Sequence, residues 1–291
     1  MASTHESPTG GIPRKPRDEE IDVFGVTHAG KVRKQNQDHF LIGSLHKHLE
    51  VLQSSIPAEN LRTADTGRLC FLMMVADGVG GSAAGEEASR TALDAITGYI
   101  QRSKHCFYTA DAQDDETFVT ELQKGALRVH SKVTQQGTQS DRAGMATTLT
   151  LFLGVWPRVY ILQVGDSRCY TWRAGRLTQL SRDQTIAEDL VTAGVIQRVD
   201  PAHKKWANFL SSAIGGPEAS PVVTAIDNDW NHVHLLCSDG LTKHVSDEQI
   251  AERLRTMTSS KQACEALLQD ALDGGGSDNI TIIVGRVVPK G

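Results

Sequence analysis

Short runs of apolar residues recur along the chain at the lengths that β-strands have, and the first of them begins near Ile21. Many runs are rich in Val, Ile, Leu and Thr and are bounded by Gly, Asp, Ser or Pro, as is typical of strands that enter turns. This pattern predicts strands over 21–28, 38–44, 69–76, 147–155, 158–166, 232–237 and 280–288. The segment CYTWRAGRLTQL predicts a further hairpin that turns at Ala174-Gly175.

Other segments have apolar residues three and four positions apart, which is the spacing of an amphipathic helix. These segments predict helices within 85–103, 115–135, 183–194 and 260–272. Ser246 and Gln249 have the spacing of a capping box, so we expect one more helix to begin there.

Strands outnumber helices, most consecutive strands can pair antiparallel, and the long helices come in two pairs that are far apart in the sequence. We therefore expect an α+β fold in which two stacked antiparallel sheets carry a pair of helices on each outer face, an α-β-β-α sandwich. Residues 19–291 are expected to form one domain, with an irregular segment at 183–220 over one end of the sheets. Residues 1–18 are expected to be a disordered tail, and 45–68 a polar stretch that could hold a short helix.

Composition narrows the class of protein. The chain has 291 residues, a net charge of −5 and a pI near 6.1, which argues against a basic surface that binds nucleic acid. Its five cysteines are odd in number and lack CxxC spacing, which favours reduced core residues in a cytosolic protein. No run approaches the roughly 20 apolar residues that a membrane span needs, and the N-terminus lacks the apolar centre of a signal peptide. We expect a cytoplasmic protein.

Four aspartates lie beside the most apolar runs of the chain. Asp77 follows CFLMMVA, Asp166 follows VYILQVG, Asp239 follows VHLLCS, and Asp278 precedes ITIIVGRVV. A carboxylate at the edge of a buried sheet loses hydration, and converging carboxylates repel one another, so a cation among them would relieve both costs. Any one of these aspartates could be an ordinary turn or cap residue, but four such placements together favour a shared cation site.

The candidate ligands all offer oxygen. Asp38 and the carbonyl oxygen of Gly78 complete the set, since a glycine lets the backbone approach a ligand closely. The sequence has no HExxH and no His or Cys ligand spacing. Oxygen-only sites suit Mg²⁺ or Mn²⁺ better than zinc or copper. Five carboxylates exceed the needs of one ion, so about two or three ions are expected, and paired ions commonly activate water for attack on phosphorus.

Six motifs then occur in a recognisable order: RKQNQDHF, MVADGVGG, GMATTLTL, VGDSRCYTWRAGRLTQLSRDQT, LLCSDGL and GSDNITIIV. In this order they resemble the metal-dependent protein Ser/Thr phosphatases of the protein phosphatase 2C family, and they look most similar to its compact bacterial members. The resemblance extends from about residue 21 to residue 288. It implies a single phosphatase domain in which the segment 184–216 is the variable flap beside the active site.

The resemblance also implies a role for each candidate ligand. Asp77 matches the acid that bridges two metal ions, and Gly78 matches the residue whose backbone oxygen is a ligand. Asp239 and Asp278 match further ligands of the first ion. Asp166 matches the acid that holds a third, weaker ion together with Asp239. Asp38, the last of the set, matches a ligand that acts through water.

Arg33 matches the arginine that grips the substrate phosphate, although alone it would look like a solvated surface charge. With Asp77 and Asp239 it makes up the expected catalytic residues. Two positions depart from the commonest family pattern. Gln37 replaces a glutamate, which removes a negative charge near the second ion. Val79 replaces a histidine that many eukaryotic members carry, so the proton donor to the leaving group is unassigned.

The implied function is hydrolysis of phosphoserine and phosphothreonine in proteins by water activated at Mg²⁺ or Mn²⁺, without a phosphoenzyme. The expected partners are phosphorylated proteins that a Ser/Thr kinase produces, and we expect a monomer that binds neither nucleic acid nor membranes. Two alternatives stay open: a catalytically idle module that binds phosphoproteins, and a general two-metal phosphoesterase or nuclease. His232 and His234 share one face of a strand and are given no role.

Overall fold

The computed structural model describes residues 14–46, 67–79, 83–103, 115–138 and 144–290. In these ranges the strands form two sheets whose neighbouring strands are all antiparallel. The first sheet has the order β1 (Ile21–His28), β11 (Ile280–Val287), β10 (Val233–Cys237), β7 (Arg168–Arg173) and β8 (Arg176–Gln179). The second has the order β2 (Asp38–His46), β3 (Arg68–Val79), β5 (Leu149–Val155), β6 (Arg158–Val164) and β9 (Val222–Asp227), and the short β4 (Ala146–Thr147) pairs with β3.

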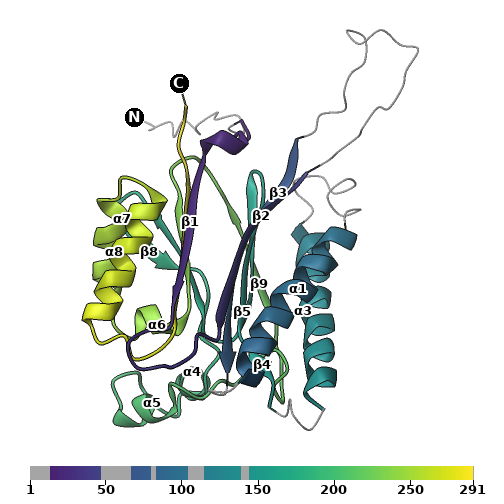
Figure 1. Cartoon of the computed structure of the whole chain (residues 1–291), viewed down its shortest axis with the longest axis vertical. Helices are drawn as coiled ribbons and strands as arrows, with labels where there is room; N and C mark the ends of the chain where they lie inside the picture. Colours follow the sequence, from purple (N-terminus) through teal and green to yellow (C-terminus); the bar gives the residue numbers. More distant parts are fainter. Residues whose placement is uncertain (1–13, 47–66, 80–82, 104–114, 139–143, 291) are drawn as a thin grey trace, which may run out of the picture.

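Each sheet carries two long helices on its outer face, and the two sheets pack against each other (Figure 1). Helices α1 (Ala83–Arg102) and α3 (Asp115–Gly137) cover the second sheet, while α7 (Asp247–Arg255) and α8 (Ser260–Asp273) cover the first. Ser246 and Gln249 form the expected capping box at the start of α7. The expected α+β sandwich of four layers is confirmed.

The core has three layers, which explains the long apolar runs in the sequence. Alternate residues of β3 point to opposite faces: Cys70, Leu72 and Met74 pack toward α1 and α3, whereas Met73 and Val75 pack between the sheets. Because this strand is buried on both faces, it reads as a continuous apolar segment rather than an alternating one.

The structure corrects the expected elements in the second half of the chain. Strand β9 was missed because it lies at the edge of its sheet and its residues are only partly buried, so its hydrophobic pattern is weak. The segment expected to be irregular contains α4 (Ile186–Thr192), at the expected place, and the unexpected short helix α5 (Pro201–Trp206). The possible helix in 45–68 falls almost wholly outside the described residues.

The boundary of the disordered tail, expected after residue 18, was also wrong, because the chain already packs on the domain from Arg14 onward. The guanidinium of Arg14 donates to both oxygens of the fully buried Glu20 carboxylate, at 2.6 and 2.8 Å. Arg68, at the start of β3, pairs with Asp18 and donates to the carbonyl oxygen of Pro16 at 2.7 Å. Residues 14–20, which include the short 3-10 helix η1 (Asp18–Glu20), therefore form an N-terminal arm packed on the domain. Residues 1–13 lie outside the described residues.

The structure describes four of the five cysteines. Cys70, Cys169, Cys237 and Cys264 are buried and free, as reduced core residues would be, while Cys106 lies outside the described residues. None of the helices in the described ranges combines the length and the apolar character needed to cross a membrane.

Candidate metal centre

A polar pocket of about 750 Å³, part of it open to solvent, lies where strands from both sheets end. Six of the seven expected site residues line it: Arg33, Asp77, Gly78, Asp166, Asp239 and Asp278. The seventh, Asp38, is buried beside them at the first position of β2, directly opposite Asp77 of β3 in the strand register. The structure therefore brings the whole expected set to one end of the sandwich.

The carboxylates come from both sheets. Asp38 and Asp77 belong to the second sheet, and Asp166 follows β6 of the same sheet. Asp239 opens α6 (Asp239–Thr242) directly after β10, and Asp278 precedes β11, both in the first sheet. Each aspartate stands where the chain leaves or enters a sheet, so its side chain can reach the pocket without interrupting the hydrophobic layers.

Two glycines make the close packing at this end possible. Gly78 has no room for a Cβ atom, which would lie 2.3 Å from the carbonyl oxygen of Gly85 and 2.9 Å from that of Gln37. Gly165 ends the strand before Asp166 with a φ of +103°, a left-handed conformation that favours glycine. Both glycines therefore let the backbone turn tightly beside an aspartate.

Asp38 is held by hydroxyl groups of the opposite sheet. Its Oδ2 atom accepts hydrogen bonds from Ser238 Oγ at 2.7 Å and from Thr281 Oγ1 at 2.8 Å. Its Oδ1 atom is buried and has no hydrogen-bond partner among the described residues. Burial, aided by the negative charge of Asp239, raises the pKa of Asp38 to about 6 despite those hydroxyl donors. One oxygen thus remains available to a ligand.

The main chain of Asp77 is anchored by two threonines, Thr147 at the end of β4 and Thr148 just before β5. Thr148 Oγ1 accepts from the amide of Asp77 at 3.0 Å, and Thr147 Oγ1 donates to the carbonyl oxygen of Asp77 at 2.8 Å. These contacts leave the carboxyl group of Asp77 free to face the pocket. The two threonines are therefore positioning residues for Asp77.

Electrostatics at the pocket favour a cation. Burial and then the charges of Asp38 and Asp239 raise the pKa of Asp77 well above its usual value. Burial, with Asp239, raises the pKa of Asp166 to about 8. Burial also raises the pKa of Asp239, although Lys243 opposes the shift. These carboxylates destabilise one another when ionised and would be relieved by positive charge.

Two basic side chains meet the acids. Lys243 Nζ lies 2.6 Å from Asp239 Oδ2 and 2.8 Å from Asp278 Oδ2. Arg33 donates to both oxygens of Asp278, at 2.8 and 3.0 Å. Burial tends to raise the pKa of Asp278, but the hydrogen bonds from Lys243 and Arg33 outweigh it and lower the pKa. Lys243 was missed in the sequence, although its position four residues after Asp239, one helical turn away, was a usable signal.

The residues fit divalent ions but are not arranged as a ready-made site. Within the described part of the chain, no three His, Cys, Asp or Glu side chains already meet as a metal-binding group. Asp38 Oδ1 and Asp239 Oδ1 are nevertheless buried without a hydrogen-bond partner, which is costly unless a ligand satisfies them. The donor set consists of oxygens, the type that Mg²⁺ and Mn²⁺ prefer.

Asn279 positions the loop that carries Arg33, a role that was not predicted from the sequence. Its Nδ2 atom donates to the carbonyl oxygens of Ala29 and Gln35 at 3.0 and 2.9 Å, and its Oδ1 atom accepts from the amide of Gln37 at 2.9 Å. Gln37 itself lines the pocket, and Val79 lies at its rim, about a third exposed.

The segment expected to be the flap packs beside the pocket. Asn208 and Leu210 line the pocket from this segment. Within it, Glu188 of α4 accepts from Arg198 at 2.7 Å and lies 3.1 Å from His203 of α5, so one carboxylate ties the two short helices together.

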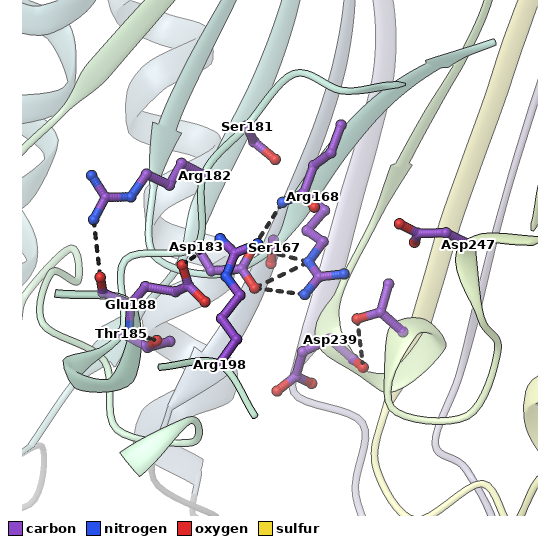
Figure 2. Close-up of polar contacts among 12 residues, drawn as sticks. Ser167, Arg168, Ser181, Arg182, Asp183, Thr185, Glu188, Arg198, Asp239 and Asp247 are labelled. Atoms are coloured by element: carbon purple, nitrogen blue, oxygen red, sulfur yellow. Dashed lines mark hydrogen bonds and ion pairs between the residues drawn. The ribbon is translucent and has the colours of Figure 1, made fainter. Parts of the chain in front are cut away.

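An ion pair between Arg168 of β7 and Asp183 anchors the segment at its base. Figure 2 shows these two side chains meeting. The Nη2 atom of Arg168 lies 2.7 Å from the Oδ2 atom of Asp183. Arg168 also donates to the hydroxyl of Tyr170 at 2.8 Å. The first sheet and the start of the segment are therefore joined directly.

Three comparisons with known proteins agree with this geometry. The family model described as protein phosphatase 2C matches residues 58–273. The serine/threonine protein phosphatase PstP of Mycobacterium tuberculosis is 35% identical over 221 residues, which are 75% of this chain and 40% of that protein. The chain thus matches less than half the length of PstP. The serine/threonine phosphatase stp of Listeria monocytogenes is 30% identical over 73% of this chain and 83% of that protein.

Solved structures show the same fold. The crystal structure of the Mycobacterium tuberculosis phosphatase PstP/Ppp covers 92% of this chain and 99% of its own, with a TM-score of 0.71 and 28% identity. The catalytic domain of PstP in complex with 2 manganese ions covers 92% of this chain with a TM-score of 0.67 and 28% identity. The family model, the relatives and the fold together show that this chain belongs to the protein phosphatase 2C family.

Proposed function

We propose that this protein is a Mg²⁺- or Mn²⁺-dependent phosphatase that hydrolyses phosphoserine and phosphothreonine in proteins. The observation that carries the proposal is the convergence of five aspartates and Arg33 at one end of the sandwich, inside the family's fold. The similarity to a PstP structure with two manganese ions supports a centre of two ions. A third ion held at Asp166 is a further part of the proposal.

In this proposal the aspartates hold the ions and Arg33 holds the substrate. Asp77, Asp239, Asp278 and the carbonyl oxygen of Gly78 would be direct ligands, and Asp38 would act through water. When bound, the ions would supply an activated water for attack on phosphorus. Arg33 would leave Asp278 and place its guanidinium fork on two phosphoryl oxygens, a geometry that suits arginine.

The carboxylates also require that metal ions bind before the phosphorylated substrate does. A phosphate dianion would be repelled by the ionised aspartates until positive charge outweighs them. The residues therefore favour a protein that is inert without divalent ions. Because water activated at the ions would be the nucleophile in this proposal, no phosphoenzyme is expected. The flap, through Asn208 and Leu210, is placed to contact the polypeptide around the phosphorylated residue.

We also propose a cytoplasmic monomer that opposes a Ser/Thr kinase. The net charge of −5 and the acidic lining of the pocket count against a nucleic-acid substrate. No observation favours the idle phosphoprotein-binding module, because Arg33 and the full set of aspartates are present in one pocket.

The test compares the chelator-treated protein with the Mn²⁺-loaded protein on a phosphothreonine peptide and on p-nitrophenyl phosphate. We expect turnover only with the metal, and loss of turnover in Asp239→Asn, whose fold is checked by circular dichroism. Equal rates with and without metal would contradict the mechanism. Binding of the phosphopeptide without turnover in the Mn²⁺-loaded protein would instead identify the idle module.

A further inference from the structure

Lys243 contacts one oxygen of each of two aspartates that the proposed function gives to a metal ion. Its ammonium group bridges Asp239 Oδ2 at 2.6 Å and Asp278 Oδ2 at 2.8 Å, and so joins α6 to the loop before β11. The other oxygen of Asp239, Oδ1, is buried without a hydrogen-bond partner among the described residues, so it stays open to an ion. An ion held by these two aspartates would lie close to the ammonium group and would be repelled by it unless Lys243 moved away.

The contacts of Lys243 differ from those of an ordinary surface ion pair. Its side chain is about two-thirds buried, and it faces carboxylates that burial has already destabilised. Among the pocket-lining residues that the structure describes, only Lys243 and Arg33 carry positive charge, and both contact Asp278. Neither the fold nor the binding of phosphate by Arg33 accounts for a second cation on the same acid.

We propose that Lys243 is a built-in counter-ion that stabilises the metal-free pocket and lowers its affinity for divalent ions. The incoming ion meets an ammonium group that already neutralises both aspartates, and even when Lys243 moves aside its charge stays tethered one helical turn from Asp239 and repels the ion. The concentration of Mg²⁺ or Mn²⁺ at which the enzyme loads is then set partly by Lys243. This inference rests on the proposed metal centre and deepens it.

Calorimetry of Mn²⁺ binding to the metal-stripped protein tests the inference. We expect Lys243→Met to bind its tightest Mn²⁺ at least about tenfold more strongly than the wild type, because the ion no longer competes with a cation. Lys243→Arg keeps the charge and should bind Mn²⁺ nearly as the wild type does. Lys261→Met, at an exposed position on α8, makes the same change in net charge far from the pocket and should have no effect.

Melting of the metal-free protein gives a second readout that does not depend on activity. Without Lys243 the carboxylates lose their counter-ion, so metal-free Lys243→Met should melt at a lower temperature than the wild type. Saturating Mn²⁺ should remove this deficit, and the metal-induced rise in melting temperature should be larger in the variant. If Lys243→Met does not fold, Lys243→Gln takes its place in both measurements.

Two results would overturn the inference. One is Mn²⁺ affinity in Lys243→Met that is equal to or weaker than that of the wild type. The other is an unchanged melting temperature of the metal-free variant. If the wild type itself binds no Mn²⁺, the proposed function fails instead, and the melting of the metal-free proteins still tests whether Lys243 acts as a counter-ion.

Discussion

Asp77 is unfavourable for the metal-free fold, although the proposed function requires it. Burial and neighbouring carboxylates raise its pKa well above the usual value, so the folded protein binds a proton there more tightly than the unfolded chain does. Folding is therefore disfavoured by this group as the pH rises above its unfolded pKa, and the penalty disappears at acidic pH.

We predict that Asp77→Asn raises the melting temperature of the metal-free protein near pH 7.5 by several degrees, since each kcal/mol moves the midpoint by about 2–4 °C in a chain of this size. The gain should shrink as the pH falls toward about 4, where the wild-type carboxyl is also protonated in the unfolded chain. The same variant should lose the stabilisation that Mn²⁺ gives the wild type. Scanning calorimetry with and without Mn²⁺ measures both, and a melting temperature below that of the wild type would contradict the argument.

His234 is a buried base, whereas Asp77 is a buried acid. It lies between the sheets, away from the candidate metal centre. Its ring packs on Phe152 with the ring centres 4.7 Å apart, and its Nε2 atom is 3.0 Å from Asn228 Oδ1. Burial, with a smaller effect from His232, lowers its pKa to about 3. The folded protein thus keeps this histidine neutral at pH values where the unfolded chain protonates it.

The free energy of unfolding should therefore fall as the pH drops from 6.5 to 5, by up to about 1.4 kcal/mol per pH unit from this one group. His234→Gln should flatten the pH dependence in that interval, whereas His28→Gln, at an exposed position, should not. Urea titrations at four pH values would show the difference. Identical slopes for His234→Gln and the wild type would rule out this origin of acid sensitivity.

At the scale of single residues, the sequence predicted which acids would gather and failed to predict what holds them. Asp77 and Asp239 were recognisable because ionisable residues beside long apolar runs are unusual. Lys243 had one local signal, its position four residues after Asp239, but its contact with Asp278 and the role of Asn279 depend on partners that are distant in the sequence and meet only in the folded protein.

At the scale of elements, burial on two faces made β3 easy to predict and the edge position of β9 made it hard. A strand at an edge needs no continuous apolar run, because one side and much of one face remain in water. The N-terminal arm was even harder to predict from the hydrophobic pattern than β9 was. Its contribution comes from ion pairs such as Arg14 with Glu20, which no hydrophobic pattern reveals.

The arm yields a prediction about truncation. Removing residues 1–18 should leave the Glu20 carboxylate and the Arg68 guanidinium without their arm partners, both in buried positions. We expect that shortened chain to lose at least about 1 kcal/mol of stability, the usual effect of stranding a hydrogen-bonded polar group. Removing only residues 1–13 keeps these contacts and serves as the matched control. Equal urea midpoints for the two chains would show that the arm is dispensable.

At the scale of the whole molecule, the candidate metal centre lies across the seam between the sheets. Asp38 and Asp77 come from one sheet, Asp239 and Asp278 from the other, and Ser238 and Thr281 reach across to Asp38. Metal affinity should therefore depend on how well the two sheets pack against each other.

A pair of leucines separates this effect from stability in general. Leu236 is fully buried between the sheets, and Leu267 is fully buried between the first sheet and α8. Either Leu→Ala change should cost about 2–5 kcal/mol. Only Leu236→Ala should also weaken Mn²⁺ binding, measured by calorimetry at a temperature where both variants are folded. Equal losses of affinity in the two variants would contradict the dependence on sheet packing.

The order of strands in the first sheet has a consequence for how the protein is made. β11, the last strand in the chain, lies between β1, the first, and β10, and Asp278 stands just before it. A ribosome must therefore complete residue 287 before β1 and β10 gain the strand that joins them. A nascent chain, or the product of a stop codon anywhere before residue 278, lacks β11 and Asp278, one of the proposed ligands. Activity should therefore appear only after β11 has been made, and products that end before residue 278 should have none.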